Sequence, residues 1–178
     1  MTFFSSPASA EALASLWRIE MLHPATVHFP VALLTVGAVL WLLGWWAGPD
    51  GRAGFLQPAA SLLLAIGAAA AWFAVLTGFW AEDAVGPTVL NAPLLRDHQN
   101  LALVTASLAT AVVLVELGPR LPARRFGPER SRAGHLPALA RGVTAVLLLA
   151  TLLTVGLAAH HGAALVYAEG AGVERLSR

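Results

Sequence analysis

The sequence predicts an all-α protein, a four-helix bundle that crosses a membrane in an up-down-up-down arrangement. Of its 178 residues, 57% are hydrophobic and 12% are charged, against about 25% charged in a soluble domain. Mean hydropathy is +0.70. Four apolar runs each approach the ~20 helical residues that cross a bilayer core about 30 Å thick. Because backbone polar groups in lipid must be bonded internally, we expect these runs to be helical.

The four helices are expected over residues 27–47, 58–80, 98–117 and 140–160. They are separated by the stretches GPDGR, EDAVGPTVLNAP and GPRLPARRFGPERSRAGHLP, whose glycine, proline and charge end helices. The chain is thus divided into an N-terminal interfacial segment (1–22), a membrane domain (23–161) and a C-terminal cap or tail (162–178). Residues 9–22 are a candidate for a short helix on the membrane surface. No internal repeat is evident.

The placement of arginine predicts the orientation. The loop 118–139 contains Arg120, Arg124, Arg125, Arg130 and Arg132, and such loops stay in the cytoplasm. Both termini then lie on the periplasmic side of a bacterial inner membrane, which the chain crosses several times. The net charge of +1 gives no indication of nucleic-acid binding. The expected partner is the lipid bilayer, because the four apolar runs are long enough to cross it. The absence of cysteine excludes disulfides, iron–sulfur clusters and covalent c-type haem attachment.

Five of the six histidines fall at one end of the predicted bundle. His23 and His28 open the first helix in HPATVHFP, His98 opens the third, and His160 and His161 end the fourth. Taken singly, each has an ordinary interpretation, such as satisfying a free backbone group at a helix end. Together they favour a binding site, because polar groups inside a membrane bundle are costly and functional.

Imidazole is the commonest nitrogen ligand for metals and for haem iron. The first and third helices of such a bundle are diagonal partners, so we expect His28 and His98 to clasp a haem b between them. His161 or His160 would pair with His23 at a second centre or hydrogen-bond to the first. The rival is a bare zinc or copper site. Its candidate ligands are His28, His98, His161 and His23.

Three further features bear on this site. Arg96 is a candidate partner for the haem propionates. Small residues in the predicted helices have two interpretations: they either form a slot beside a cofactor or allow close helix packing. These residues are Gly37, Gly44, Gly67, Ala71, Gly78 and Gly156. Trp41 and Glu116 stand near the cytoplasmic ends of their helices, so we expect both at the membrane interface. No nucleophile, phosphate loop or hydrolytic motif is present, and no catalytic residue is assigned.

The stretches LHPATVHFPVALL (22–34) and HHGAALVYAEGAGV (160–173) carry a resemblance to a known family. With TG at 77–78 and the isolated His98, they resemble the signatures of the uncharacterised bacterial membrane family filed as domain of unknown function 2231, over residues 20–174. One departure is Gly162-Ala163, where paired glycines are expected. The family is similar in layout to membrane cytochromes, and its members often accompany c-type cytochrome modules. The resemblance implies electron transfer through haem b, with His23, His28, His98 and His161 as the functional set.

These observations favour an electron-transfer protein or complex subunit over a stand-alone enzyme. It would relay electrons between a periplasmic carrier, such as a c-type cytochrome, and a quinone or another membrane subunit. We expect the closing segment to fold back as a short extended cap over the histidines, where Tyr167 would bond a histidine or a propionate. The alternative is a non-haem scaffold, or a copper- or zinc-binding subunit of a larger complex.

Overall fold

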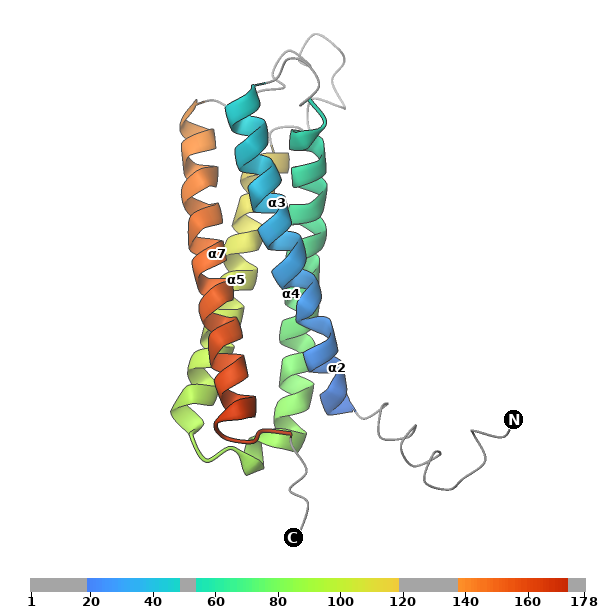
Figure 1. Ribbon diagram of the computed structural model, residues 1–178, viewed down its shortest axis with the longest axis vertical. Coiled ribbons are helices and arrows are strands. Elements are labelled where there is room, and N and C mark those ends of the chain that lie inside the picture. Colours follow the sequence, from blue (N-terminus) through green and yellow to red (C-terminus); the bar gives the residue numbers. More distant parts are fainter. Residues whose placement is uncertain (1–18, 49–53, 119–137, 173–178) are drawn as a thin grey trace, which may run out of the picture.

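The computed structural model confirms the predicted all-α class and describes residues 19–48, 54–118 and 138–172. Four long helical segments lie side by side (Figure 1). Helices α2 (Ile19–Thr26) and α3 (His28–Ala47) form the first segment, and α4 (Leu56–Val85), α5 (Ala92–Leu117) and α7 (Ala138–Tyr167) form the others. The short 3₁₀ helix η1 (Gly86–Thr88) follows α4. All four segments are long and apolar enough to cross a membrane.

The two helices of the first segment are nearly continuous. Val27 joins them with helical dihedral angles, φ −62° and ψ −23°. The interruption has a simple cause, because Pro30 has no N–H to donate to the carbonyl of Thr26. Because Val27 is itself helical, the residues of α2 and α3 keep one helical register.

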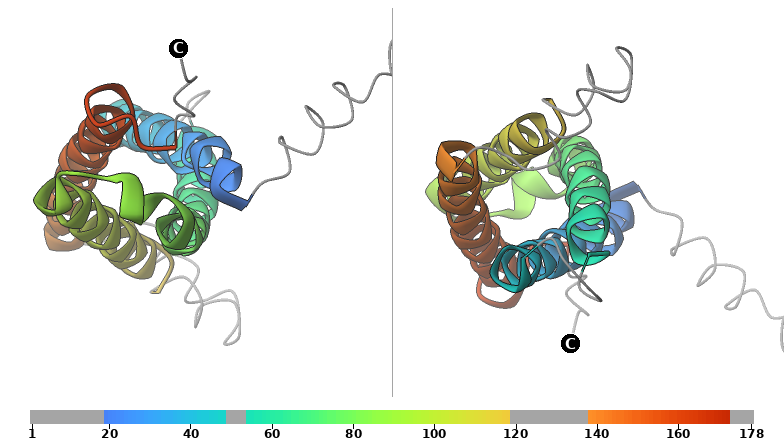
Figure 2. Two further views of the ribbon diagram at one scale, coloured as in Figure 1. Left: turned by 90° about the horizontal axis from the view of Figure 1, so that it is seen from below. Right: turned by 90° about the horizontal axis from the view of Figure 1, so that it is seen from above.

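The four segments occupy the corners of a square, with α3 and α5 on one diagonal and α4 and α7 on the other (Figure 2). Helix α3 packs mainly against α4, and α5 packs mainly against α7. We call the end where α2 and α5 begin and α4 and α7 end the histidine end. The opposite end, where α3 and α5 end, is the tryptophan end. The described chain begins and ends at the histidine end (Figure 1).

Glycines bring α3 and α4 close together in the core. A Cβ atom on Gly37 would lie 3.0 Å from Cδ2 of Leu64, and one on Gly67 would lie 2.9 Å from Cδ2 of Leu34. Each leucine thus fills the space above a glycine of the other helix, so these two glycines serve helix packing. The hydrophobic core lies in the middle and toward the tryptophan end; it consists of Leu34, Ala38, Trp41, Ala60, Leu64, Ala68, Ala109, Val112 and Leu148.

The helices extend further at the histidine end than the apolar runs predict. Helix α5 begins at Ala92, where the side chain of Asn91 accepts a hydrogen bond of 3.1 Å from the N–H of Leu94. An asparagine cap and a proline in the first turn start a helix without any apolar signal. Helices of 30 residues, such as α4 and α7, are about 45 Å long and exceed the hydrocarbon core of about 30 Å.

The closing segment differs from the expected extended cap. Residues up to Tyr167 continue α7 as helix. Beyond the helix, Gly170 adopts the left-handed conformation with φ +71°, and the N–H of Ala171 donates back to the carbonyl of Leu165 at 2.9 Å. Only then does the chain fold back, reaching Val85 of α4 at Gly172. Most of the candidate surface helix (9–22), and the arginines of the loop 118–139, lie outside the described residues.

Candidate functional site

Two histidines face each other across the diagonal of the bundle at the histidine end. The ring centroids of His23, on α2, and His98, on α5, are 6.1 Å apart, and the ring planes are 79° from parallel. Both side chains are half-buried. The partner of His98 in the structure is therefore His23, which lies five residues before the expected His28 in the chain.

The ring of His23 is held by α4. Its Nδ1 lies 3.0 Å from the carbonyl oxygen of Ala74 and 3.4 Å from the hydroxyl of Thr77. Because a carbonyl oxygen only accepts, Nδ1 carries the proton of the neutral ring and Nε2 keeps its lone pair. Thr77 is fixed in turn, since its hydroxyl donates to the carbonyl of Ala74 at 3.0 Å and lies 2.9 Å from that of Thr26.

The ring of His98 is held by α7 in the same way. Its Nδ1 donates to the carbonyl oxygen of Ala158 at 2.9 Å, so its Nε2 also keeps a lone pair. Neither Nε2 makes a hydrogen bond within the described residues. This is the state in which imidazole binds a metal, with the other nitrogen bonded to a carbonyl that fixes the ring.

A glycine makes room for each ring. A Cβ atom on Gly78 would lie 3.1 Å from Cε1 of His23, and one on Gly162 would lie 3.0 Å from Cε1 of His98. In both cases the glycine follows the accepting carbonyl by four residues, which places both on one helix face. The bundle thus contains two equivalent half-sites, AVLTG (74–78) with His23 and AAHHG (158–162) with His98.

This repetition was missed in the sequence, where no internal repeat is evident. The available signal is an alanine four residues before a glycine, near the end of the second and of the fourth helix. Alanine and glycine are common in membrane helices. The pattern therefore gains meaning only when each motif is seen beside a histidine of the preceding helix.

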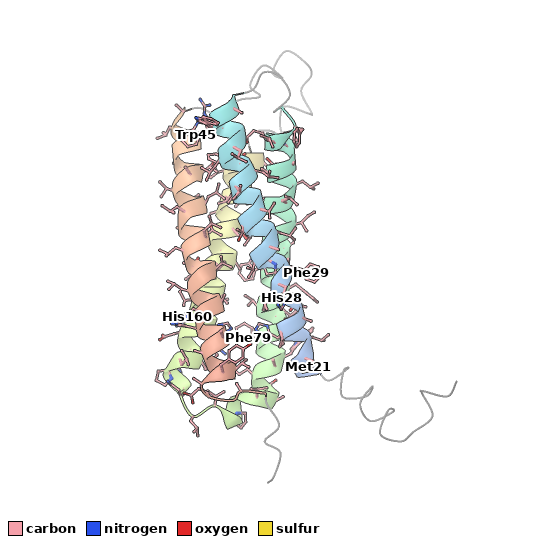
Figure 3. All side chains as sticks on the ribbon, viewed as in Figure 1. Met21, His28, Phe29, Trp45, Phe79 and His160 are labelled. Atoms are coloured by element: carbon pink, nitrogen blue, oxygen red, sulfur yellow. The ribbon has the colours of Figure 1, made fainter. Side chains whose placement is uncertain are left out.

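The other predicted site residues are not part of the pair of His23 and His98. His28 is exposed at the start of α3, and His160 is exposed on α7; Figure 3 shows them on different helices. His161 is half-buried with its ring centroid 6.0 Å from that of His160, and its buried Nδ1 has no hydrogen-bond partner among the described residues. Arg96 is exposed. Tyr167 is the last residue of α7, and its side chain is 89% exposed, so it does not cover the histidines.

These positions bear on the rival site. Among the described residues, no three histidine, aspartate or glutamate side chains are grouped so that they could hold a metal ion. Within the part of the chain that the structure describes, no third ligand of these types joins the pair of His23 and His98. The structure therefore gives no support to a bare site built from all four predicted ligands.

A second polar pair spans the same diagonal at the tryptophan end. Nε1 of Trp41 donates to Oε1 of Glu116 at 2.8 Å, and each side chain is 1% exposed. From their depth both are expected at the membrane interface; in the structure both side chains face the interior of the bundle and bond to each other. Eighteen residues separate His23 from Trp41 and also His98 from Glu116. At 3.6 residues per turn this is about five turns, so each helix presents both of its residues on one face.

Comparison with known proteins agrees with this architecture. The family model described as "Predicted membrane protein (DUF2231)" matches residues 20–175. The chain therefore belongs to this family and is a membrane protein, as the end motifs predicted. No match was found among curated proteins or among solved structures.

Proposed function

We propose that the protein binds a haem b between His23 and His98 and transfers electrons through it. The observation that carries the proposal is the pair itself: two imidazoles on diagonal helices, each with Nδ1 bonded to a carbonyl and Nε2 left as a ligand. A metal ligand in proteins has this arrangement. The helix-capping interpretation would not require two rings to meet across the bundle.

The distance between the rings fits one metal atom between them. Metal–nitrogen bonds to histidine are about 2.0 Å, and the ring centre lies about 1.1 Å further, so opposed imidazoles have centroids about 6.2 Å apart. In the structure the two ring centroids are 6.1 Å apart. A structural or catalytic zinc ion takes three or four protein ligands, whereas haem iron takes one or two axial ones. Two histidines with no third ligand among the described residues therefore favour haem.

The chain's own residues have defined tasks in this proposal. The carbonyls of Ala74 and Ala158 hold each ring in the tautomer that binds metal and make Nε2 more basic. Gly78 and Gly162 let the rings lie close to α4 and α7. A bound haem would supply reversible one-electron chemistry, and burial and ligation by the protein would tune its potential. No side chain needs to act as an acid, base or nucleophile.

The orientation and the partners form part of the same proposal. The arginine-rich loop 118–139 favours placing the histidine end on the periplasmic side of a bacterial inner membrane. Electrons would then pass between a periplasmic carrier, such as a c-type cytochrome, and a quinone or another membrane subunit.

The test is the visible spectrum of the purified protein. Protein expressed with an ample haem supply and kept in mild detergent should give a reduced-minus-oxidised spectrum with the α band of low-spin haem b. Haem extracted from the same sample should amount to one per chain. A colourless protein would contradict the proposal. Its copper and zinc content would then separate a metal-binding subunit from a scaffold.

A further inference from the structure

We infer that His161 is a binding residue that hydrogen-bonds a carboxylate group of the cofactor held between His23 and His98. The inference rests on the proposed function and goes beyond it, because it assigns a role to a histidine that is not a ligand. It follows from a difference between two equivalent positions, Thr77 and His161.

Thr77 and His161 occupy the same place in the two half-sites. Each immediately precedes the glycine that accommodates the ligand histidine, Gly78 in one case and Gly162 in the other. Thr77 is 0% exposed, and its hydroxyl has partners in the protein: it donates to the carbonyl of Ala74 and contacts the hydroxyl of Thr26. The α4 side of the site is therefore closed and satisfied.

His161 is not satisfied in this way. Its Nδ1 is buried and has no hydrogen-bond partner among the described residues, and it is the one buried side-chain nitrogen or oxygen there in that condition. A buried polar atom without a partner costs about 1–3 kcal/mol, and such an atom in a folded protein requires an explanation. A bound group that reaches the α7 side of the pair supplies the missing partner.

The chemistry of the proposed cofactor names that group. A haem b carries two propionate carboxylates as its only strongly polar substituents. An imidazole N–H donates a charge-assisted hydrogen bond to a carboxylate, which is about twice as strong as a neutral one. His161 directly precedes Gly162, which contacts the ring of His98, and it interacts electrostatically with His98 itself. His160, the exposed neighbour whose ring is 6.0 Å away, offers a matched control.

The experiment compares haem with haem dimethyl ester, in which both carboxylates are blocked. The full chain, prepared without haem, is titrated with each form in detergent. The variants are His161→Phe, His161→Asn, whose amide lies near the position of Nδ1, and His160→Phe. The wild type should bind haem about tenfold more tightly than the ester. His161→Phe should lose most of this preference, while His160→Phe keeps it and His161→Asn recovers part of it.

The outcomes separate the two proposals. If all proteins bind haem and His161→Phe keeps the full preference, the inference is overturned while the proposed function stands. Equal binding of haem and ester by the wild type would also overturn the inference alone. A wild type that binds neither overturns the proposed function and the inference with it. Where phenylalanine prevents binding by its bulk, His161→Ala gives the same comparison.

Discussion

The two ends of the diagonal between the first and third helices carry polar pairs of opposite character. At the tryptophan end, Trp41 and Glu116 are directly hydrogen-bonded at 2.8 Å and sealed from solvent. At the histidine end, His23 and His98 face each other without a direct hydrogen bond, and each is turned so that Nδ1 is used and Nε2 is not. The same two helix faces therefore carry both arrangements, about five turns apart.

The difference between the two pairs shows how a purely structural pair in this bundle can be distinguished from a ligand site. A pair that only ties helices together satisfies its polar atoms, because an unpaired polar atom in a low-dielectric interior is costly. The surroundings also differ: Trp41 belongs to the hydrophobic core, whereas Ala74, Thr77 and Gly78 lie against the ring of His23. The histidine end has the features of a site for a ligand, and the tryptophan end those of a clamp.

The largest effect is expected from removing one histidine of the pair, His23 or His98. His23→Ala and His98→Ala should each abolish the low-spin haem spectrum, because one imidazole cannot provide both axial ligands. His28→Ala, at an exposed position five residues after His23, should retain haem at the wild-type ratio. Haem content per chain and the reduced spectrum measure this. Loss of haem in His28→Ala with retention in His23→Ala would restore the pairing expected from sequence.

A smaller change is to fill the space beside each ring. In Gly78→Ala and Gly162→Ala the added Cβ would come within 3.1 and 3.0 Å of a histidine ring atom. Such overpacking costs typically ~1–3 kcal/mol, so we expect haem affinity to fall about tenfold or more. Gly156→Ala, which has open space around it, should bind haem as the wild type does. Equal affinities in all three would show that the glycines are not part of the site.

The clamp at the tryptophan end should affect stability without affecting the site. Glu116→Leu leaves the buried indole N–H of Trp41 without its acceptor, which should lower the free energy of unfolding by about 1–3 kcal/mol. Trp46→Phe, at a 90% exposed position on the same helix, should have little effect. Thermal unfolding in detergent gives the stability, and haem per folded chain should stay unchanged in both variants. A loss of haem in Glu116→Leu would contradict the separation of roles.

The smallest effect is expected from the hydroxyl behind His23. Thr77→Val removes the contacts with Ala74 and Thr26 but leaves the 3.0 Å bond between His23 and the carbonyl of Ala74. We expect a loss of about 0.5–1.5 kcal/mol in stability and a retained low-spin spectrum. Thr105→Val, whose hydroxyl bonds only within α5, serves as the control. Displacement of haem by Thr77→Val alone would mean that Thr77 itself holds the ligand ring.

The sequence predicts the bundle well and the site only in part. Long apolar runs report burial in lipid directly, so the number and type of helices follow from them. The pairing of His98 depends on which side of the first helix faces inward. In HPATVHFP we expected His28 to face His98, but His28 is exposed, whereas the ring of His23 lies against that of His98. The partnership of Trp41 and Glu116 joins residues far apart in the chain, and only packing across the diagonal reveals it.

The most direct measurement is electron paramagnetic resonance of the oxidised wild-type protein, with His98→Ala beside it. Two imidazoles on one ferric iron make it low-spin, and ring planes 79° apart should give a strongly anisotropic low-spin signal that disappears in the variant. A high-spin signal in the wild type, or no haem signal from protein made with ample haem, would contradict the account that His23 and His98 together bind one iron.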